Sequence, residues 1–411
     1  MRTVYLDNGS ATKIDPEVLE AMLPYLKDEY GNAQSMHSLG QKAKDALENS
    51  RAAVAGLINA PTSQIIFTSC GSESNNLAIK GVAYAYRDRG KHIIVSSIEH
   101  FSVLQAAKRL NQEGYEITYL PVDKYGVVSP DELEKNIRKD TILVSIQHAN
   151  PEIGTIQDIK KLSEIVHKAG AFLHTDAVAS AGIIPIDVNE LGVDLLSFAG
   201  STIYGPKGAG ALFFKKGLRL VPLFDGGIQE SGRRAGTENI PAIVGFGKAC
   251  EIAKEELRTN AEKMAGLQKR LINELSQRIQ YIYLNGHPEN RLPNNVNFSV
   301  EFVEGEGMLL FLDQKGIYVT SGSACTSRAL KMSHVLQAIK IDPAVAQGSV
   351  LMVLSKYNTD EDIDYILNEF PPIVTQLRNM SPLYAYFLKT GKRMEAGPGT
   401  DYEHHHDDEN S

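Results

Sequence analysis

The 411-residue chain contains little cysteine, with Cys70, Cys250 and Cys325 as its only thiols. Three scattered thiols form neither a disulfide framework nor a zinc cluster, so each must be considered alone. No stretch approaches the roughly 18 apolar residues that span a bilayer, and the beginning, MRTVYLDNGS, lacks the apolar core of a signal peptide. We therefore expect a soluble, unsecreted, cytoplasmic protein with no membrane partner.

Positive charge is also scarce, because 42 Lys and Arg face 50 Asp and Glu, a net charge of −8. No concentrated basic face is visible, so small molecules or proteins are the expected partners and nucleic acid is not. The motifs GxxxxGK[ST], HExxH and CxxC are absent. The turn in YGPKGAGALFF, at 204–214, leads into a strand rather than a helix, so it is not a Rossmann fingerprint.

Short β-rich runs alternate with amphipathic helical stretches between about residues 63 and 214. This alternation predicts an α/β domain with a doubly wound, mainly parallel sheet, whose ligand site lies beyond the carboxyl ends of the strands. The predicted strands are IIFTS at 65, HIIVSS at 92, EITYL at 116, TILVSIQ at 141, AFLHTD at 171 and LLSFAG at 195, and the predicted helices include Ser74–Arg89, Phe101–Glu113 and Ile159–Lys168.

Longer helices and fewer strands follow Ala242, which indicates a second, smaller α+β domain. One apolar stripe predicts a helix that bridges into it; the stripe comprises Leu257, Met264, Leu267, Leu271, Leu275 and Ile279. We predict a large domain at 14–255, a small domain formed by 1–13 and 256–385, and a disordered tail at 386–411. The Ser- and Gly-rich stretch SGSACTSRALKM, at 321–332, is predicted to be a mobile loop.

Three segments of the large domain have residues suited to chemistry. In TSCGSESNN, the N–H groups of Gly71 and Ser72 at a helix start form a candidate anion cradle, although an ordinary N-capped helix explains the same residues. Asp176 directly follows an apolar strand, where it would pair with a protonated ring nitrogen or cap the next helix. His100 lies at a strand-to-helix junction, where an imidazole would stack on a flat ligand or act as a cap.

The three cysteines differ in their surroundings. Cys325 lies in the predicted mobile loop, where an accessible thiol suits sulfur transfer or metal ligation. Cys250 is expected to be a small core residue, and Cys70 a turn residue without a role. The tail histidines His404, His405 and His406 suit metal binding, but adjacent histidines among acidic residues are more often simply solvated.

Taken in order, ten segments resemble the cysteine desulfurases of the IscS/NifS type, within the class-V aminotransferase family. They are YLDNGSAT, YGNAQSMHSLG, IIFTSCGSESNNLAI, SIQHANPEIGT, HTDA, IYGPKGAGAL, GRRAGTENIPAIVG, RLPNNVNFS, SGSACTS and YNTDEDID. The stretches YLNGHP, RLPNNVN and MSPLY are most similar to archaeal IscS-type proteins, some of which lack the Schiff-base lysine. The resemblance implies the type I fold of pyridoxal-phosphate-dependent transferases and a homodimer.

The resemblance also implies roles for particular residues. Gly71 and Ser72 would hold the phosphate of pyridoxal 5'-phosphate, His100 would stack on its ring, Asp176 would pair with the ring nitrogen, and Asn150 would approach the ring oxygen. Thr237 would reach the phosphate bound to the neighbouring subunit, and Asn32 would touch the substrate carboxylate. Cys325 would accept sulfur as a persulfide or act as a transient iron–sulfur ligand.

Five positions depart from the family pattern. Where the family has Ser-Phe-Ser-Ala-His-Lys, this chain has SFAGST, so Thr202 replaces the Schiff-base lysine, Ser201 a phosphate-binding His and Ala199 a phosphate-binding Ser. A threonine has no amine with which to hold the cofactor covalently or to move the substrate proton. Ala179 replaces a Gln at the ring oxygen. Leu351 replaces the Arg that holds the substrate carboxylate, a loss worth roughly 2 to 5 kcal/mol of binding.

Two hypotheses follow. The first is an IscS-like protein of iron–sulfur cluster assembly with absent or impaired desulfurase activity, for which L-cysteine is a doubtful substrate. It would present Cys325 to an IscU-like scaffold, share a cluster with it, and receive sulfur from another donor such as sulfide. The second is an active cysteine desulfurase that holds pyridoxal phosphate non-covalently through Ser72, His100, Asp176 and Thr237.

Overall fold

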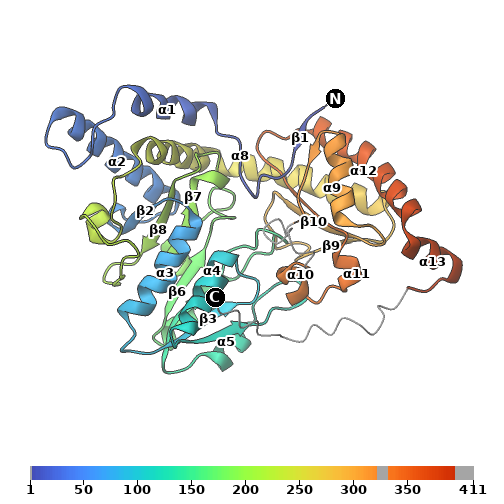
Figure 1. Ribbon diagram of the computed structural model, residues 1–411, viewed down its shortest axis with the longest axis horizontal. Coiled ribbons are helices and arrows are strands. Elements are labelled where there is room, and N and C mark those ends of the chain that lie inside the picture. Colours follow the sequence, from blue (N-terminus) through green and yellow to red (C-terminus); the bar gives the residue numbers. More distant parts are fainter. Residues whose placement is uncertain (1, 322–331, 394–411) are drawn as a thin grey trace, which may run out of the picture.

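A seven-stranded sheet with helices packed against it forms one half of the molecule (Figure 1). The computed structural model describes residues 2–321 and 332–393. The strand order is β2-β8-β7-β6-β5-β3-β4, and β8 runs antiparallel to both of its neighbours while the other pairings are parallel. The bounds are β2 Ile65–Thr68, β3 His92–Ser96, β4 Glu116–Leu120, β5 Thr141–Ser145, β6 Phe172–Asp176, β7 Leu195–Ala199 and β8 Gly210–Phe214.

The helices of this half connect the strands and enclose the sheet (Figure 1). They are α1 Pro16–Lys27, α2 Ser38–Leu57, α3 Gly71–Ala85, α4 Phe101–Gln112, α5 Pro130–Asn136, α6 Ile159–Lys168, α7 Val188–Leu191 and the 3-10 turns η1 Thr62–Gln64, η2 Gly200–Thr202 and η3 Gln229–Gly232. The predicted strands and helices are present. The sequence places the start of α3 at Ser74, three residues late, because the turn before it has no apolar periodicity.

The second half contains a three-stranded antiparallel sheet in the order β12-β10-β9, and a pair of short parallel strands, β1 and β11. The strands are β1 Val4–Tyr5, β9 Ile282–Leu284, β10 Asn295–Val300, β11 Ile317–Tyr318 and β12 Ser349–Val353. The helices are α9 Gly305–Gln314, α10 His334–Ala338, α11 Pro343–Ala346, α12 Asp360–Met380 and α13 Pro382–Thr390.

The 39-residue helix α8, Ile240–Arg278, runs from one half to the other (Figure 1). Its first part contributes Phe246 and Cys250 to the buried apolar cluster beneath the large sheet. Its later part contributes Met264 and Leu271 to the cluster beneath the small sheet. Residues of the predicted apolar stripe thus pack in the core of the second half, as expected for a helix that bridges the two halves. The domain limits at 13/14 and 255/256 stay a prediction.

The chain end differs from the predicted tail, because α13 continues to Thr390 and Gly391 closes it in the left-handed conformation. Phe387 stacks on Phe302 with ring centroids 4.8 Å apart, and this contact orders a segment that the sequence alone assigns to the tail at 386–411. The chain from 394 onward, with His404, His405 and His406, lies outside the described residues.

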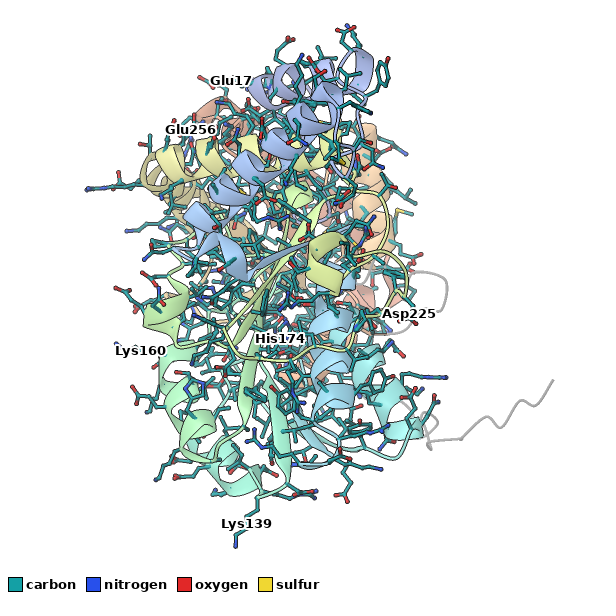
Figure 2. The ribbon with its side chains drawn as sticks, turned by 90° about the vertical axis from the view of Figure 1, so that its left-hand side faces the viewer. Glu17, Lys139, Lys160, His174, Asp225 and Glu256 are labelled. Carbon is teal, nitrogen blue, oxygen red and sulfur yellow. The ribbon has the colours of Figure 1, made fainter. Side chains whose placement is uncertain are left out.

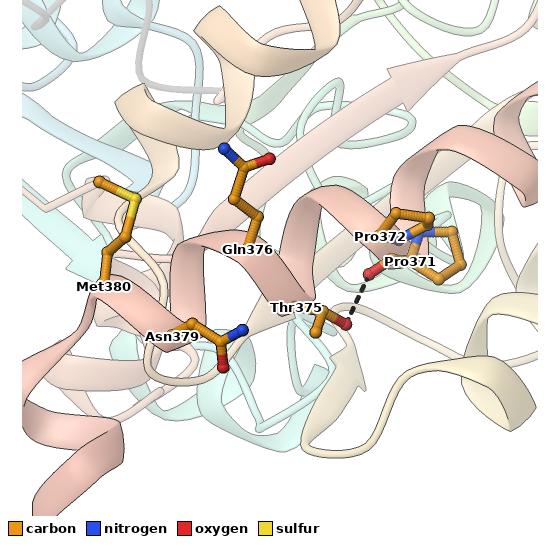
Figure 3. A pocket seen from close by; sticks show the side chains of 6 residues that line it. All are labelled: Pro371, Pro372, Thr375, Gln376, Asn379 and Met380. Atoms are coloured by element: carbon orange, nitrogen blue, oxygen red, sulfur yellow. Dashed lines mark hydrogen bonds between the residues drawn. The ribbon is translucent and has the colours of Figure 1, made fainter.

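Helix α12 contains two prolines, which remove two backbone donors from its interior. The carbonyl of Leu367, which Pro371 leaves without an N–H partner, accepts instead from Arg278 Nη1 at 3.0 Å. Thr375 Oγ1 donates to the Pro371 carbonyl at 3.0 Å (Figure 3). A hollow of about 750 Å³ lies along this helix, and none of its lining residues is one that the sequence selects for chemistry; they are Pro371, Pro372, Thr375, Gln376, Asn379 and Met380.

Candidate active site

Asp176 is the last residue of β6, and its carboxylate is only 7% exposed. Val178 N donates to its Oδ1 at 2.9 Å, and Asn75 Nδ2 donates to its Oδ2 at 2.6 Å. Burial raises the pKa of the Asp176 carboxyl, whereas these donors and the nearby His100 oppose the rise. The position beyond the carboxyl end of a central strand is the one that the sequence predicts for a ligand site.

His100 is the N-cap of α4 and lies next to Asp176. Its Nδ1 accepts from the Ser102 backbone N–H at 3.1 Å and lies 2.7 Å from the Ser102 hydroxyl. Of its two expected roles, the cap is confirmed. The cap uses only one ring nitrogen, so the exposed ring stays compatible with stacking.

Val178 brings three of the predicted site residues together. Besides its N–H bond to Asp176, its carbonyl accepts from Thr202 Oγ1 at 2.8 Å. Its Cγ2 lies 2.5 Å from the place where a Cβ on Gly71 would stand, so any larger residue at the start of α3 would clash. Gly71, Asp176 and Thr202 therefore surround one short turn.

The start of α3 is not the ordinary capped helix that the alternative interpretation expects. The N-cap is Cys70, which makes no side-chain capping hydrogen bond, and Ser72 is an exposed residue of the first turn. The first N–H groups of the helix consequently keep their capacity to bind an anion. Asn76 Nδ2 donates to the Ser72 carbonyl, so this hydrogen bond does not involve the Ser72 hydroxyl.

Asn150 lies beneath this group and is buried. Its Oδ1 accepts from the backbone N–H groups of Glu152 and Ile153, and its Nδ2 donates to the Ile98 carbonyl at 3.1 Å. The Asn150 amide thus stabilises the turn at residues 150–153 and links it to Ile98, two residues before His100. One amide hydrogen remains for a ligand.

Asn32 and Thr237 are exposed and lie in a different place. Gln34 Nε2 donates to Glu238 Oε1 at 3.1 Å, so the segments of Asn32 and Thr237 meet each other beside a polar cavity of about 550 Å³. None of the described contacts joins either residue directly to Asp176 or His100. A described hydrogen bond links the Thr237 segment to α3: Arg234 Nε donates to Glu73 Oε1 at 2.9 Å.

The altered positions lie in two parts of the structure: Ala179, Ala199, Ser201 and Thr202 lie near Val178, whereas Leu351 belongs to β12 of the second half. Thr202 ends the 3-10 turn η2, and its hydroxyl is bonded to backbone carbonyls, at 2.8 Å to Val178 and 3.4 Å to Ala199. The Ser201 carbonyl accepts from Thr12 N at 2.9 Å. Leu351 is 5% exposed and exchanges two backbone hydrogen bonds with Thr320. Ala179 is half-buried.

Two buried acids beneath the site are not evident from the sequence. Glu99 accepts from Ser96 Oγ at 2.5 Å and from Gln147 N at 2.8 Å, and burial raises its pKa to about 8. Glu152 accepts from Ser333 Oγ at 2.7 Å, and burial raises its pKa to about 7. One oxygen of each acid has no hydrogen-bond partner. The only feature of the sequence that points to these acids is their position: Glu99 directly precedes His100, and Glu152 lies two residues after Asn150.

Other residues singled out by the sequence fall outside this group. Cys325 lies outside the described residues, Cys250 is buried as expected with a raised pKa, and Cys70 is exposed. His174, which the sequence analysis does not select, is fully buried (it is labelled in Figure 2); it bonds Ser145 and Ser197, and burial lowers its pKa to about 3. Among residues 2–321 and 332–393, no His, Cys, Asp and Glu cluster is suited to a metal ion, and no helix is long and apolar enough to cross a membrane.

Comparison with known proteins identifies the family. Residues 4–366 match the class-V aminotransferases. The cysteine desulfurase IscS of Dictyoglomus turgidum is 50% identical over 381 residues, which cover 93% of this chain and 97% of that protein. IscS 1 of the archaeon Archaeoglobus fulgidus is 50% identical over 380 residues, covering 92% and 99%. IscS of Methanosarcina thermophila is 51% identical over 382 residues, covering 93% and 94%.

Solved structures agree. A NifS-like protein superposes with a TM-score of 0.86 at 39% identity, covering 92% of this chain and 100% of that one. The apo cysteine desulfurase of Thermococcus onnurineus NA1 superposes with a TM-score of 0.82 at 27% sequence identity, covering 91% of this chain and 95% of that one. The chain belongs to the class-V aminotransferase family, with the type I fold of pyridoxal-phosphate-dependent transferases. Within that family its relatives are the IscS- and NifS-type cysteine desulfurases.

Membership implies pyridoxal phosphate as the cofactor, and the residues fit its two ends unequally. The buried Asp176 carboxylate and exposed His100 suit the ring, and the first N–H groups of α3, which Cys70 leaves without a side-chain cap, suit the phosphate. Thr202, at the position where the resemblance implies a lysine, offers only a hydroxyl that is already bonded to the Val178 carbonyl, so it does not suit covalent attachment.

Proposed function

We propose that this protein acts in iron–sulfur cluster assembly with lost or strongly impaired desulfurase activity, and that it presents Cys325 to an IscU-like scaffold. The observation that carries the proposal is Thr202, which stands in the position of the Schiff-base lysine and donates its hydroxyl to Val178. Pyridoxal phosphate, when bound in this family, serves as the electron sink for breaking bonds at the substrate's α-carbon. Without an amine at 202, this chain has no side chain there to move a proton.

Weakened substrate binding is a second part of the proposal. Leu351, in the place of the carboxylate-binding Arg, is buried, and its backbone pairs with Thr320. Thr320 and Ser321 immediately precede the segment with Cys325, and Ser349 Oγ donates to the Ser321 carbonyl at 3.2 Å. The chain that bears the thiol therefore departs from beside a position that has lost its substrate-binding cation. The thiol is retained in the sequence while the cation is not.

Sulfur in this proposal arrives from a donor such as sulfide rather than from L-cysteine. With sulfide as the donor, Cys325 serves as a ligand of a shared iron–sulfur cluster, because thiolates are the usual protein ligands of such clusters. Cys325 serves as a persulfide carrier only where the donor is itself a persulfide, whose outer sulfur is transferred to the Cys325 thiolate while the donor leaves as a thiolate.

A homodimer is part of the proposal. Large apolar side chains are unusually exposed in the two segments that carry Asn32 and Thr237: Met36 is 94% exposed, Ile228 81% and Tyr30 78%. Apolar surface of this kind is typical of a protein interface. A second copy covering it would bring Thr237 toward the pocket of its partner.

The test of the proposal is cluster formation on an IscU-like scaffold with iron and sulfide supplied, followed by the visible absorbance of the cluster. Addition of this protein should accelerate the reaction, and Cys325→Ser should abolish the acceleration. Cys70→Ser is the matched control, since it removes the exposed thiol of the described residues and should leave the rate unchanged. An undiminished rate with Cys325→Ser would refute the thiol's role.

The second candidate is an active desulfurase with non-covalent pyridoxal phosphate, and the intact hydrogen bonds around Asp176 favour it. Robust sulfide release from L-cysteine by the unaltered protein with added cofactor would support this candidate over the first. Release confined to the Thr202→Lys variant would support the first.

A further inference from the structure

Asn75 bonds Asp176 directly and, among the described contacts, reaches His100 only through Ser102, whose hydroxyl lies beside the imidazole. Asn75 lies in the second turn of α3, is only 1% exposed, and is oriented inward. Its Nδ2 group donates to Asp176 Oδ2 at 2.6 Å and to Ser102 Oγ at 2.8 Å, so both amide hydrogens are used. Its Oδ1 is buried without a hydrogen-bond partner. A buried oxygen without a partner costs free energy of folding, and at Asn75 this cost accompanies two hydrogen bonds to two different site residues.

The direction of each hydrogen bond follows from the donors. Because the Asn75 NH₂ group can only donate, Ser102 Oγ accepts from it and must direct its own hydrogen elsewhere. The His100 Nδ1 atom lies 2.7 Å from that hydroxyl and also accepts from the Ser102 N–H. Two donors at Nδ1 fix the neutral ring of His100 with its hydrogen on Nε2, the nitrogen left for a ligand.

We propose that Asn75 is a positioning residue that couples Asp176 to His100 through Ser102, so that the partner of the ring nitrogen and the stacking imidazole are set as one unit before any cofactor binds. The inference concerns the protein without cofactor, and it stands or falls separately from the proposed role of Cys325. It predicts that a change at Asn75 alters His100, although the two side chains do not touch in any described contact.

The experiment uses ¹⁵N-histidine NMR of the full-length protein without cofactor, with the His100 resonances assigned by His100→Gln. The unaltered protein should show an unprotonated Nδ1 and a protonated Nε2. Asn75→Asp reverses the direction of the hydrogen bond between residue 75 and Ser102. The carboxylate accepts the hydrogen of the Ser102 hydroxyl, which then no longer points to His100 Nδ1. The Nδ1 resonance should shift toward the protonated form, and pyridoxal phosphate should bind at least about 10-fold more weakly.

Two controls separate coupling from general damage. Asn76→Asp places the same charge on the adjacent residue, whose amide bonds only backbone carbonyls, and should leave the His100 resonances in place. In the double variant Asn75→Asp with Ser102→Ala, the bridging hydroxyl is gone, so the effect of Asn75→Asp on His100 should vanish. The proposal is overturned if Asn75→Asp leaves His100 unchanged, or if the shift persists undiminished without the Ser102 hydroxyl.

Discussion

The two ends of the candidate pocket differ in what their polar groups are bonded to. At the ring end, defined by Asn75, His100, Ser102 and Asp176, side chains bond to one another and hold a carboxylate and an imidazole ready. At the attachment end, defined by Ala199, Ser201 and Thr202, the Thr202 hydroxyl bonds backbone carbonyls and Ala199 has no polar side-chain atom. Side chains thus bond one another at the first end, whereas at the second the one described side-chain donor is used by the backbone.

Unpartnered buried atoms show the same difference. Among the described residues, buried side-chain oxygens without a hydrogen-bond partner include Asn75 Oδ1 at the ring end and one oxygen each of Glu99 and Glu152 beneath it, and none belongs to the attachment end. Such atoms are costly in a folded protein and are retained where the surroundings require them. The attachment end therefore resembles ordinary protein interior, which agrees with the proposal that Thr202 does not hold a cofactor covalently.

The largest expected effect is the return of covalent attachment in Thr202→Lys. An amine at 202 would stand beside Val178 and Asp176, and the lost Thr202 hydrogen bond costs only about 1 kcal/mol. The purified variant should absorb visible light after addition of pyridoxal phosphate, and borohydride should fix the cofactor to residue 202 in peptide mass spectra. The unaltered protein and Thr202→Met should show neither signal. Cofactor fixed at the exposed Lys207 instead would contradict the assignment of the attachment end.

The next largest effect concerns pH and the buried acid beneath the ring end. The pKa of Glu99 is about 8 in the folded protein, against its ordinary 4.5, so the folded state keeps a proton that the unfolded chain releases. The free energy of unfolding therefore falls as pH rises from about 4.5 to 8, by up to about 5 kcal/mol. Denaturant unfolding of Glu99→Gln at several pH values should show a shallower fall over this window.

Glu152→Gln is the matched control for that measurement. The pKa of Glu152 is about 7, so its contribution to the pH dependence of stability ends near pH 7. Only Glu99→Gln should therefore flatten the fall in the free energy of unfolding between pH 7 and 8. Equal slopes for Glu99→Gln and the unaltered protein between pH 7 and 8 would contradict the prediction.

The sequence predicts much of this arrangement, and the limits have physical causes. Strands and helices follow from apolar periodicity, and Asp176 and His100 are found because each stands at a strand end where side chains converge. Glu99, Asn75 and Ser102 are missed, since nothing local shows that a glutamate will be buried or that an amide will bridge two elements. Those properties arise only when β6, α3 and α4 pack together.

A smaller effect is expected at Ser333, which joins the second half of the molecule to the pocket floor. Its hydroxyl donates to Glu152 and also caps α10 through Val335 N. Ser333→Ala removes both bonds and should lower the free energy of unfolding by about 2 kcal/mol. Ser333→Thr keeps the hydroxyl and should cost clearly less. Equal losses in the two variants would show that the hydroxyl has no such role.

The smallest effect distinguishes helix capping from anion binding at the start of α3. Cys70 occupies the N-cap without a side-chain hydrogen bond, so Cys70→Ser and Cys70→Asp should each raise the unfolding free energy by about 0.5 to 1 kcal/mol relative to Cys70→Ala. The two variants should differ toward phosphate, because a carboxylate competes for the N–H groups of Gly71 and Ser72 and repels an anion. Cys70→Asp should therefore weaken binding of pyridoxal phosphate, measured by titration of its absorbance, while Cys70→Ser does not. Equal binding by both variants would place the phosphate away from α3 and remove the cradle from the ring end of the pocket.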